Sequence, residues 1–223
     1  MKEMSWKATS IITEIRNKAD IRTVVEDEKM SKICILKGSP RKNGNTNTLL
    51  QPFVEEMEKQ GHQCEMFDLH DMDINPCIAC RNCQDDQTIF GCVHKDDMQK
   101  IFDSILESEL IVLASPIYSW YCTPPMKMVL DRLVYGMNKF YGEQEEKPAL
   151  WVGKKVAILT TCGYRPDKGA DLFEEGIKRY CKHSQLKYCG MLVERHMGYN
   201  TEFFDDEKAQ HAAQFAVELA EQI

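Results

Sequence analysis

Short apolar runs alternate with longer segments of helical period from residue 32 to the C-terminus, and this alternation restricts the chain to few folds. The apolar runs are rich in Val and Ile, which is typical of parallel strands that are covered on both faces. Strands are predicted at 32–37, 62–68, 110–115, 155–161 and 187–194. Helices are predicted at 46–60, from about 96, after Pro124-Pro125, at 170–182 and at 205–221, and the carboxylates of Asp96 and Asp97 suit the N-cap and first turn of the second helix. Five strands in alternation with five helices predict an α/β fold, a doubly wound sandwich with a parallel sheet.

Residues 1–30 lie outside this alternation. Met4, Ile11 and Ile15 belong to an apolar stripe of three- and four-residue spacing, which predicts an amphipathic helix. The stripe could pack on its own domain or on a partner subunit, and the sequence leaves both interpretations open. We therefore expect a helical extension at 1–30, a single domain at 31–223 and a homo-oligomer.

The composition argues against two classes of protein. No stretch approaches the roughly 18 consecutive apolar residues of a membrane-spanning helix, and no apolar signal segment begins the chain. We therefore expect a cytoplasmic protein without a membrane partner. The 28 Lys and Arg residues against 35 Asp and Glu give a net charge of −7. A nucleic-acid-binding protein would instead carry a basic stripe, so we expect no nucleic-acid partner.

A glycine-rich turn follows the first predicted strand and leads into a helix. The segment from Gly38 to Thr46 reads G-S-P-R-K-N-G-N-T. Such a turn gathers backbone N–H groups at the positive end of a helix dipole, which favours a phosphate. The segment has neither the Walker A spacing nor a G-x-G-x-x-G motif, and Asn45 takes the place of the Walker lysine. A monophosphate fits the turn best, and an ordinary polar turn is the alternative.

Aromatic residues and turn amides follow the third and fourth predicted strands. In an open α/β sheet the ligand binds at the carboxyl ends of the strands, where the strand order reverses. The third strand ends in S-P-I-Y-S-W-Y at 115–121, and the fourth ends in T-C-G at 161–163. The aromatic and proline residues could line a flat heterocycle, whose carbonyl oxygens the turn amides could bind. A phosphate and a planar ring together indicate FMN, although the aromatic stretch could instead form surface packing or a subunit interface.

Three motifs at these positions resemble the flavodoxin-like NAD(P)H-dependent FMN reductases, and most closely their iron-sulfur flavoprotein branch. They are G-S-P-R-K-N-G-N-T, S-P-I-Y followed by P-M-K-M-V-L-D-R, and G-K-K-V-A-I-L-T-T-C-G. The resemblance covers about residues 32–195 and implies the strand order 2-1-3-4-5. It also implies a non-covalently bound FMN that takes hydride from NAD(P)H and passes electrons to a quinone, a flavin or another small acceptor.

The resemblance assigns residues to the two ends of the FMN site. The residues implied on the phosphate are Ser39, Arg41, Asn45 and Thr46. Those implied around the ring are Pro116, Ile117, Tyr118, Thr161, Cys162 and Gly163, with Trp120 shaping the acceptor side. No side chain stands out as a general acid or base, because the cofactor performs the chemistry in such enzymes. Arg195 and His196, at the end of the last strand, could lie near the acceptor pocket but are expected at the surface.

Four of the ten cysteines lie within 16 residues, at Cys77, Cys80, Cys83 and Cys92. The C-x2-C-x2-C spacing is typical of ligands to a [4Fe–4S] cluster, whereas structural zinc sites usually use two separated pairs. Eight residues precede Cys92, a longer gap than in the iron-sulfur flavoproteins. The sequence therefore favours a reductase without a cluster. The alternative is an iron-sulfur flavoprotein that carries electrons, with a ferredoxin as partner, while zinc, redox-active thiols and plain free thiols remain open.

Two further expectations concern the cysteines. The four clustered residues follow the second strand, which neighbours the first, so they are expected to open on the same sheet edge as the flavin. The six scattered cysteines are expected to be inert thiols of the core. They are Cys34, Cys64, Cys122, Cys162, Cys181 and Cys189.

Overall fold

A five-stranded parallel sheet forms the centre of the protein. The structure is a computed structural model that describes residues 30–142, 145–198 and 200–223, so the predicted N-terminal helix lies outside the described residues. The strands are β1 (Lys32–Lys37), β2 (Gln63–Asp68), β3 (Leu110–Pro116), β4 (Lys155–Cys162) and β5 (Lys187–Arg195). They pair in parallel in the order β2-β1-β3-β4-β5. The predicted fold class and strand order are thus confirmed.

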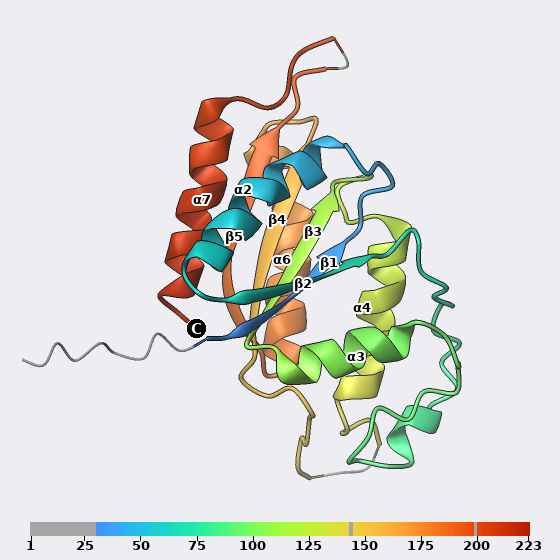
Figure 1. Cartoon of the computed structure of the whole chain (residues 1–223). Coiled ribbons are helices and arrows are strands. Elements are labelled where there is room, and N and C mark those ends of the chain that lie inside the picture. Colours follow the sequence, from blue (N-terminus) through green and yellow to red (C-terminus); the bar gives the residue numbers. More distant parts are fainter. Residues whose placement is uncertain (1–29, 143–144, 199) are drawn as a thin grey trace, which may run out of the picture.

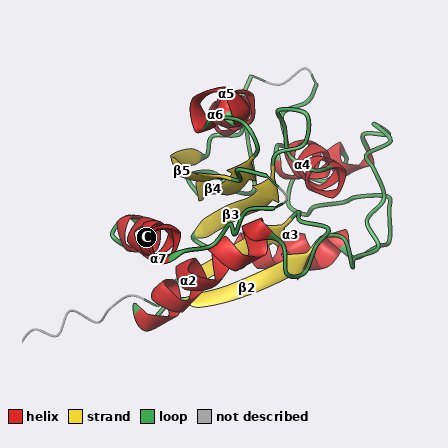
Figure 2. Ribbon diagram, turned by 90° about the horizontal axis from the view of Figure 1, so that it is seen from above, coloured by secondary structure: helices red, strands yellow, loops and turns green. Residues whose placement is uncertain are grey.

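Helices cover both faces of this sheet. The helices are α2 (Asn45–Lys59), α3 (Met98–Glu107), α4 (Pro124–Met137), α5 (Pro166–Gly169), α6 (Asp171–His183) and α7 (Asp206–Ala220). Figures 1 and 2 show α2 and α7 on one face and α3, α4 and α6 on the other. The five predicted helices are present with boundaries shifted by a residue or two. The single turn of α5 and the short 3-10 helix η1 (Asn82–Gln84) were not predicted.

The two halves of the core follow from the two-residue period of the strands. On β1, Ile33 and Ile35 pack against α2 and α7, whereas Cys34 and Leu36 pack against the helices of the other face. All four side chains are fully buried. Burial of an aliphatic side chain of this size contributes about 1.5–3 kcal/mol, so both helical layers are held firmly on the sheet.

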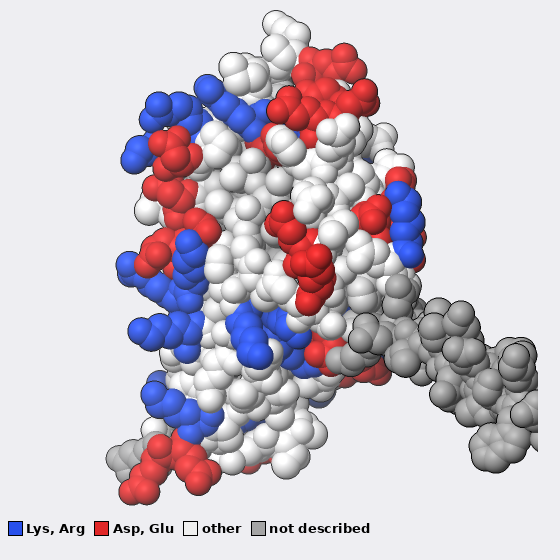
Figure 3. Space-filling model, turned by 90° about the vertical axis from the view of Figure 1, so that its left-hand side faces the viewer, with Lys and Arg blue, Asp and Glu red and all other residues white. Residues whose placement is uncertain are grey.

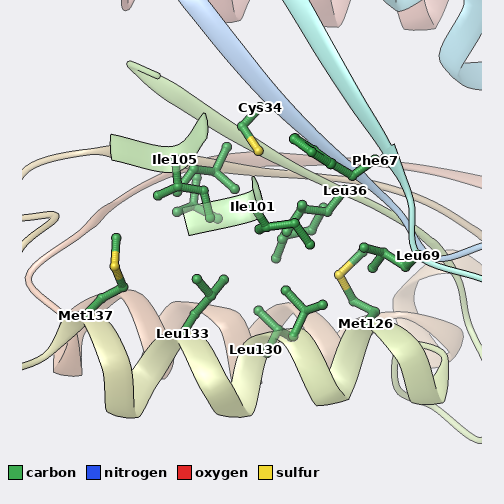
Figure 4. Close-up of a cluster of buried hydrophobic side chains, with 14 of the residues drawn as sticks. Cys34, Leu36, Phe67, Leu69, Ile101, Ile105, Met126, Leu130, Leu133 and Met137 are labelled. Carbon is green, nitrogen blue, oxygen red and sulfur yellow. The ribbon is translucent and has the colours of Figure 1, made fainter. Parts of the chain in front are cut away.

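Helix α4 is held in place by one apolar stripe. Proline at its first positions suits a helix start, because the missing N–H would have no partner there. Figure 4 shows Met126, Leu130, Leu133 and Met137 on the side of α4 that faces the sheet and α3. Their spacing of three or four residues follows one helix face, so the stripe fixes the helix along its whole length.

The scattered cysteines are free, and most lie in the core. Cys34, Cys122, Cys162 and Cys181 are buried, and Cys64 and Cys189 are half-buried. Burial raises the pKa of the Cys34 and Cys181 thiols to about 12. These thiols therefore stay protonated and behave as small apolar side chains, as predicted.

The surface carries charges of both signs. Figure 3 shows Lys and Arg side chains along one edge of the face over α7, and Asp and Glu side chains over its centre and top. This face therefore presents no uniformly basic surface. Among the described residues, no helix combines the length and the apolar character that crossing a bilayer requires.

Candidate functional site

A cavity of about 120 Å³ opens at the carboxyl edge of the sheet. It is lined by Ser39, Pro40, Arg41, Gly44, Asn45, Thr46, Pro116, Ile117, Tyr118, Thr161, Cys162, Gly163 and His196. These residues come from three separate loops, after β1, β3 and β4, and from the end of β5. The structure brings together every residue that the resemblance assigned to FMN except Trp120, which does not line the cavity.

The N-terminal end of α2 forms one side of the cavity. Gly44 is the N-cap of α2 and has no side chain that could bond to the first amides of this helix, and no acidic residue lies in its first turn. The Asn47 amide donates to the carbonyls of Arg41 and Lys42, at 2.9 and 3.1 Å, and so holds the loop closed. An anion at this end of the cavity would meet free N–H groups, the helix dipole and the Arg41 guanidinium.

Buried hydroxyl groups fix the strand ends around this cavity. The Thr123 hydroxyl donates to the Gly38 carbonyl at 2.7 Å, and its amide donates to Ser115 Oγ at 3.1 Å. The Thr160 hydroxyl donates to the Ser115 carbonyl at 2.6 Å. A Cβ at Gly38 would lie 2.7 Å from Thr123 Oγ1, so only glycine permits this close approach.

A second hydroxyl pair joins α2 to β4. Thr46 Oγ1 and Thr161 Oγ1 lie 2.8 Å apart, and both side chains are buried. Because each hydrogen bond is shielded from water, the loops at opposite ends of the cavity keep fixed relative positions. The Thr46–Thr161 pair therefore ties α2 to β4 within the lining of the cavity.

The loop after β3 makes a tight hairpin around Ser119 and Trp120. Tyr118 and Tyr121 exchange backbone hydrogen bonds of 2.8 and 3.0 Å. The two residues between them, Ser119 and Trp120, have φ of 49° and 65°, a left-handed conformation that is costly without glycine. As a result the Trp120 ring stacks on Tyr164 at 5.6 Å, which explains why this predicted residue does not line the cavity.

His196 lines the cavity, although a surface position was the favoured expectation. Its amide donates to the Cys162 carbonyl at 2.8 Å, which extends the pairing of β5 with β4 by one residue. Its position directly after the last predicted strand had left a place near this edge open. Pro40 and Gly44 also line the cavity, because they belong to the same loop as the predicted phosphate ligands.

A second cavity, of about 150 Å³, contains all four clustered cysteines in its wall. Its lining is Cys77, Ile78, Ala79, Cys80, Arg81, Cys83, Phe90, Cys92, Val93, His94, Arg132 and Tyr135. Ala79 and Arg81 have φ of 54° and 64°, so the backbone turns sharply between successive cysteines. The residues between Cys83 and Cys92 fold back, so that Cys92 lines the same cavity as the other three cysteines.

The cysteine loop packs against the C-terminal half of α4. The Cys83 thiol donates to the Tyr135 carbonyl at 3.3 Å, and the Gln84 amide donates to the same carbonyl at 2.6 Å. Gly136 is required here, because a Cβ at this position would lie 1.7 Å from the Phe90 ring. The chain after β2 therefore follows α4 rather than the sheet edge (Figure 1).

This path corrects the expected location of the cysteines. The two cavities share no lining residue. The start of α4 contacts the loop after β1 through Thr123, whereas the cysteine loop contacts Tyr135, twelve residues further along. At about 1.5 Å per residue these two contacts are about 18 Å apart. The expectation that the cysteines open on the edge that holds the first cavity is therefore wrong.

A buried ion pair borders the cysteine cavity. Arg132 donates to Asp96 Oδ2 at 2.6 Å and to Cys92 Sγ at 3.1 Å, and both charged side chains are only 2% exposed. Burial alone would raise the pKa of Asp96, but hydrogen bonds from Arg132 and Asn75 outweigh it and lower this pKa to about 2. Asp96 was predicted as a helix cap, and its partner on α4 could not be read from the local sequence.

We expect the pair of Asp96 and Arg132 to make the free energy of unfolding depend on pH in the acid range. The folded pKa of Asp96, about 2, is below the unfolded value of about 3.9, so its stabilisation is complete above about pH 4. It is lost as the pH falls through about 2, and the shift corresponds to about 2–3 kcal/mol. Urea unfolding at pH 5 and pH 3 measures the first part of this loss. The loss between these values should be smaller in Asp96→Asn, whose side chain does not titrate.

The placement of the thiols distinguishes two kinds of metal site. Among the described residues, no three His, Cys, Asp or Glu side chains converge where a single metal ion could sit. Zinc needs four ligands at about 2.0–2.3 Å from one point, so the arrangement does not favour it. A [4Fe–4S] cluster takes each thiolate on a different iron, and four thiols spread around one cavity fit that donor pattern.

Known proteins share both the sequence pattern and the fold. The profile of the family described as NADPH-dependent FMN reductase matches residues 31–170. An iron-sulfur flavoprotein from Methanosarcina thermophila is 29% identical over 172 residues, which are 77% of this chain and 80% of that protein. One from Methanocaldococcus jannaschii is 33% identical over 101 residues, 45% of this chain and 51% of that protein. The chain thus matches about half the length of the latter relative.

Solved structures support the fold. The NAD(P)H:quinone oxidoreductase from Methanothermobacter marburgensis superposes with a TM-score of 0.65 at 17% identity, over 86% of this chain and 94% of that chain. An azoreductase from Bacillus anthracis gives 0.58 at 14% identity, over 87% and 100%. Since the family profile covers more than half of the sequence and the strand order agrees, this chain belongs to the NADPH-dependent FMN reductase family.

Proposed function

We propose that this protein is an FMN-dependent oxidoreductase that takes hydride from NAD(P)H and passes electrons to a small acceptor such as a quinone or a flavin. The observation that carries this proposal is the single cavity at the carboxyl edge. It joins an anion-binding helix end to the loops after β3 and β4, as a phosphate attached to a planar ring requires. Bound FMN would supply the hydride and electron transfer.

The residues of the chain would position the cofactor and control access to it. Arg41 and the first turn of α2 would hold the phosphate, with Ser39 and Thr46 beside it. The backbone at the carboxyl end of β4, at Thr161, and in the loop after it, at Gly163, would hold the polar edge of the ring. No lining side chain is required as a general acid or base for hydride transfer.

Exposed aromatic side chains beside the cavity suit a planar substrate. Tyr118 lines the cavity and is 44% exposed, and the stacked rings of Trp120 and Tyr164 are 46% and 62% exposed. The Trp120 indole donates to the Lys168 carbonyl at 3.1 Å, which holds this pair in place. A nicotinamide or a quinone could stack against such rings, because aromatic faces attract one another in offset arrangements.

Thr46→Ala should weaken FMN binding roughly tenfold to a hundredfold. A hydrogen bond to a charged phosphate contributes about 1.5–3 kcal/mol, and each 1.4 kcal/mol is about tenfold in affinity. Fluorescence titration of apoprotein with FMN measures the change, and Thr46→Ser, which retains the hydroxyl, is the matched control. Unchanged affinity of the alanine variant would show that the FMN phosphate does not bind at this loop. FAD that binds as tightly as FMN would also contradict a closed monophosphate site.

A second candidate function is an iron-sulfur flavoprotein that carries electrons, with a ferredoxin as partner. The shared cavity of Cys77, Cys80, Cys83 and Cys92 favours it, since the long gap before Cys92 was the main argument against a cluster. Because of that gap, the sequence alone favoured a reductase without a cluster. The closure of the loop onto α4 removes the reason for that preference.

A further inference from the structure

A buried lysine follows α4 directly and contacts the cysteine loop. Lys139 is 1% exposed, and its ammonium donates to the Cys83 carbonyl at 2.5 Å and to the Phe90 carbonyl at 3.4 Å. Within the described part of the chain, no carboxylate forms an ion pair with it. A buried charge without a counter-ion is strongly unfavourable, so this lysine needs an explanation.

Positive charge also dominates the wall of the cavity beside it. Two arginines, Arg81 and Arg132, line the cavity, and no Asp or Glu is among its lining residues. Asp96 neutralises Arg132 from outside the lining. Lys139 forms no ion pair with a carboxylate of the described residues, and its ammonium lies next to the carbonyls of two lining residues. The site is therefore suited to hold a group of negative charge.

We propose that Lys139 is the counter-ion of an iron–sulfur cluster held by Cys77, Cys80, Cys83 and Cys92, and that it raises the reduction potential of this cluster. The inference rests on the second candidate function. Four thiolates outweigh the positive charge of the cluster core, so the bound group is an anion. Its reduction adds one electron and one further negative charge. A nearby buried cation stabilises the reduced form more than the oxidised form, and net charge is a main determinant of cluster potentials.

A purely structural role is the competing explanation, because the ammonium also ties two carbonyls of the loop together. Two substitutions separate the roles. Lys139→Gln keeps N–H donors for the carbonyls of Cys83 and Phe90 but removes the charge. Lys139→Arg keeps the charge and donors in a different shape. Lys127→Gln is the control, since Lys127 lies on the exposed side of α4 and pairs with Asp131.

The test is an anaerobic redox titration of the reconstituted full chain, with dithionite as reductant and electron paramagnetic resonance as readout. Iron, sulfide and FMN are measured on the same samples. Lys139→Gln should shift the equilibrium between reduced and oxidised cluster about tenfold toward the oxidised form, which is about 59 mV for one electron. Lys139→Arg and Lys127→Gln should stay near the wild-type potential. A Lys139→Gln variant with the wild-type potential overturns the proposal.

The remaining outcomes are also decisive. Loss of the cluster from Lys139→Gln but not from Lys139→Arg supports the requirement for charge. Loss from both variants, with or without loss of FMN, shows a packing role and overturns the proposal. If the wild-type chain binds FMN but takes up no iron and sulfide, the counter-ion proposal and the second candidate function both fail. The proposal of an FMN-dependent oxidoreductase then stands, because its test does not involve the cysteines.

Discussion

Asp96→Ala should lower the free energy of unfolding by about 3–5 kcal/mol. The substitution leaves the Arg132 guanidinium buried without a carboxylate, and breaking a buried ion pair by removal of one partner typically has this cost. It also removes the acceptor for the Asn75 amide, which donates to Asp96 at 2.9 Å. Few single substitutions destabilise a domain of this size by more. Urea unfolding followed by far-ultraviolet circular dichroism measures the change.

The control for Asp96→Ala is an exposed ion pair on α4, the helix that also carries Arg132. Asp131 lies 2.5 Å from Lys127, and the two side chains are 44% and 50% exposed. Exposed pairs contribute about 0–1 kcal/mol, so Asp131→Ala should change the stability little. If Asp96→Ala is no more destabilising than Asp131→Ala, the buried pair does not hold the cysteine loop on α4.

Cys80→Ser should remove most of the iron and sulfide from anaerobically reconstituted protein. The wild-type chain is expected to contain about four of each, because the ligands of a [4Fe–4S] cluster act as a set. FMN should be retained, since the cysteine cavity shares no residue with the cavity at the carboxyl edge. Cys64→Ser is the matched control, because Cys64 is half-buried on β2 and lies outside both cavities.

Metal analysis of the wild-type protein decides among the interpretations of the cysteines. Iron and sulfide that survive in Cys80→Ser would contradict the assignment of ligands. Stoichiometric zinc without iron would give the cysteines a structural role, since zinc has no redox chemistry. Protein without either metal that still oxidises NAD(P)H would leave the thiols outside the reaction.

The fold could be predicted because its signals are local. Each strand is an apolar run, and each helix shows its own period, so five strands and five helices could be located from short windows of sequence. The strand order followed from the resemblance, and the loops after β1, β3 and β4 then had to meet at one edge. This meeting is why ten of the eleven residues assigned to FMN line a single cavity.

The remaining features depend on contacts between distant residues. Asp96 and Arg132 are 36 residues apart, and nothing near Asp96 distinguishes a helix cap from half of an ion pair. Trp120 lies outside the lining of the cavity, in a turn of two left-handed residues, and neither is a glycine that would have indicated the turn. The cysteine loop packs on α4 through Tyr135 and Gly136. The Tyr135 carbonyl accepts a hydrogen bond from the Cys83 thiol, and Gly136 leaves room for the Phe90 ring.

Helix α4 acts as a rigid spacer between the two cavities. Its first turn is bonded to the loop after β1, and its last turns are bonded to the cysteine loop. An uninterrupted α-helix hardly changes length, so no rearrangement short of unfolding α4 can bring the two contact points together. The separation of about 18 Å between these two contact points therefore does not change while α4 stays intact. A change in the distance between the two cavities of one chain would therefore have to come from the loops that α4 holds, not from the helix itself.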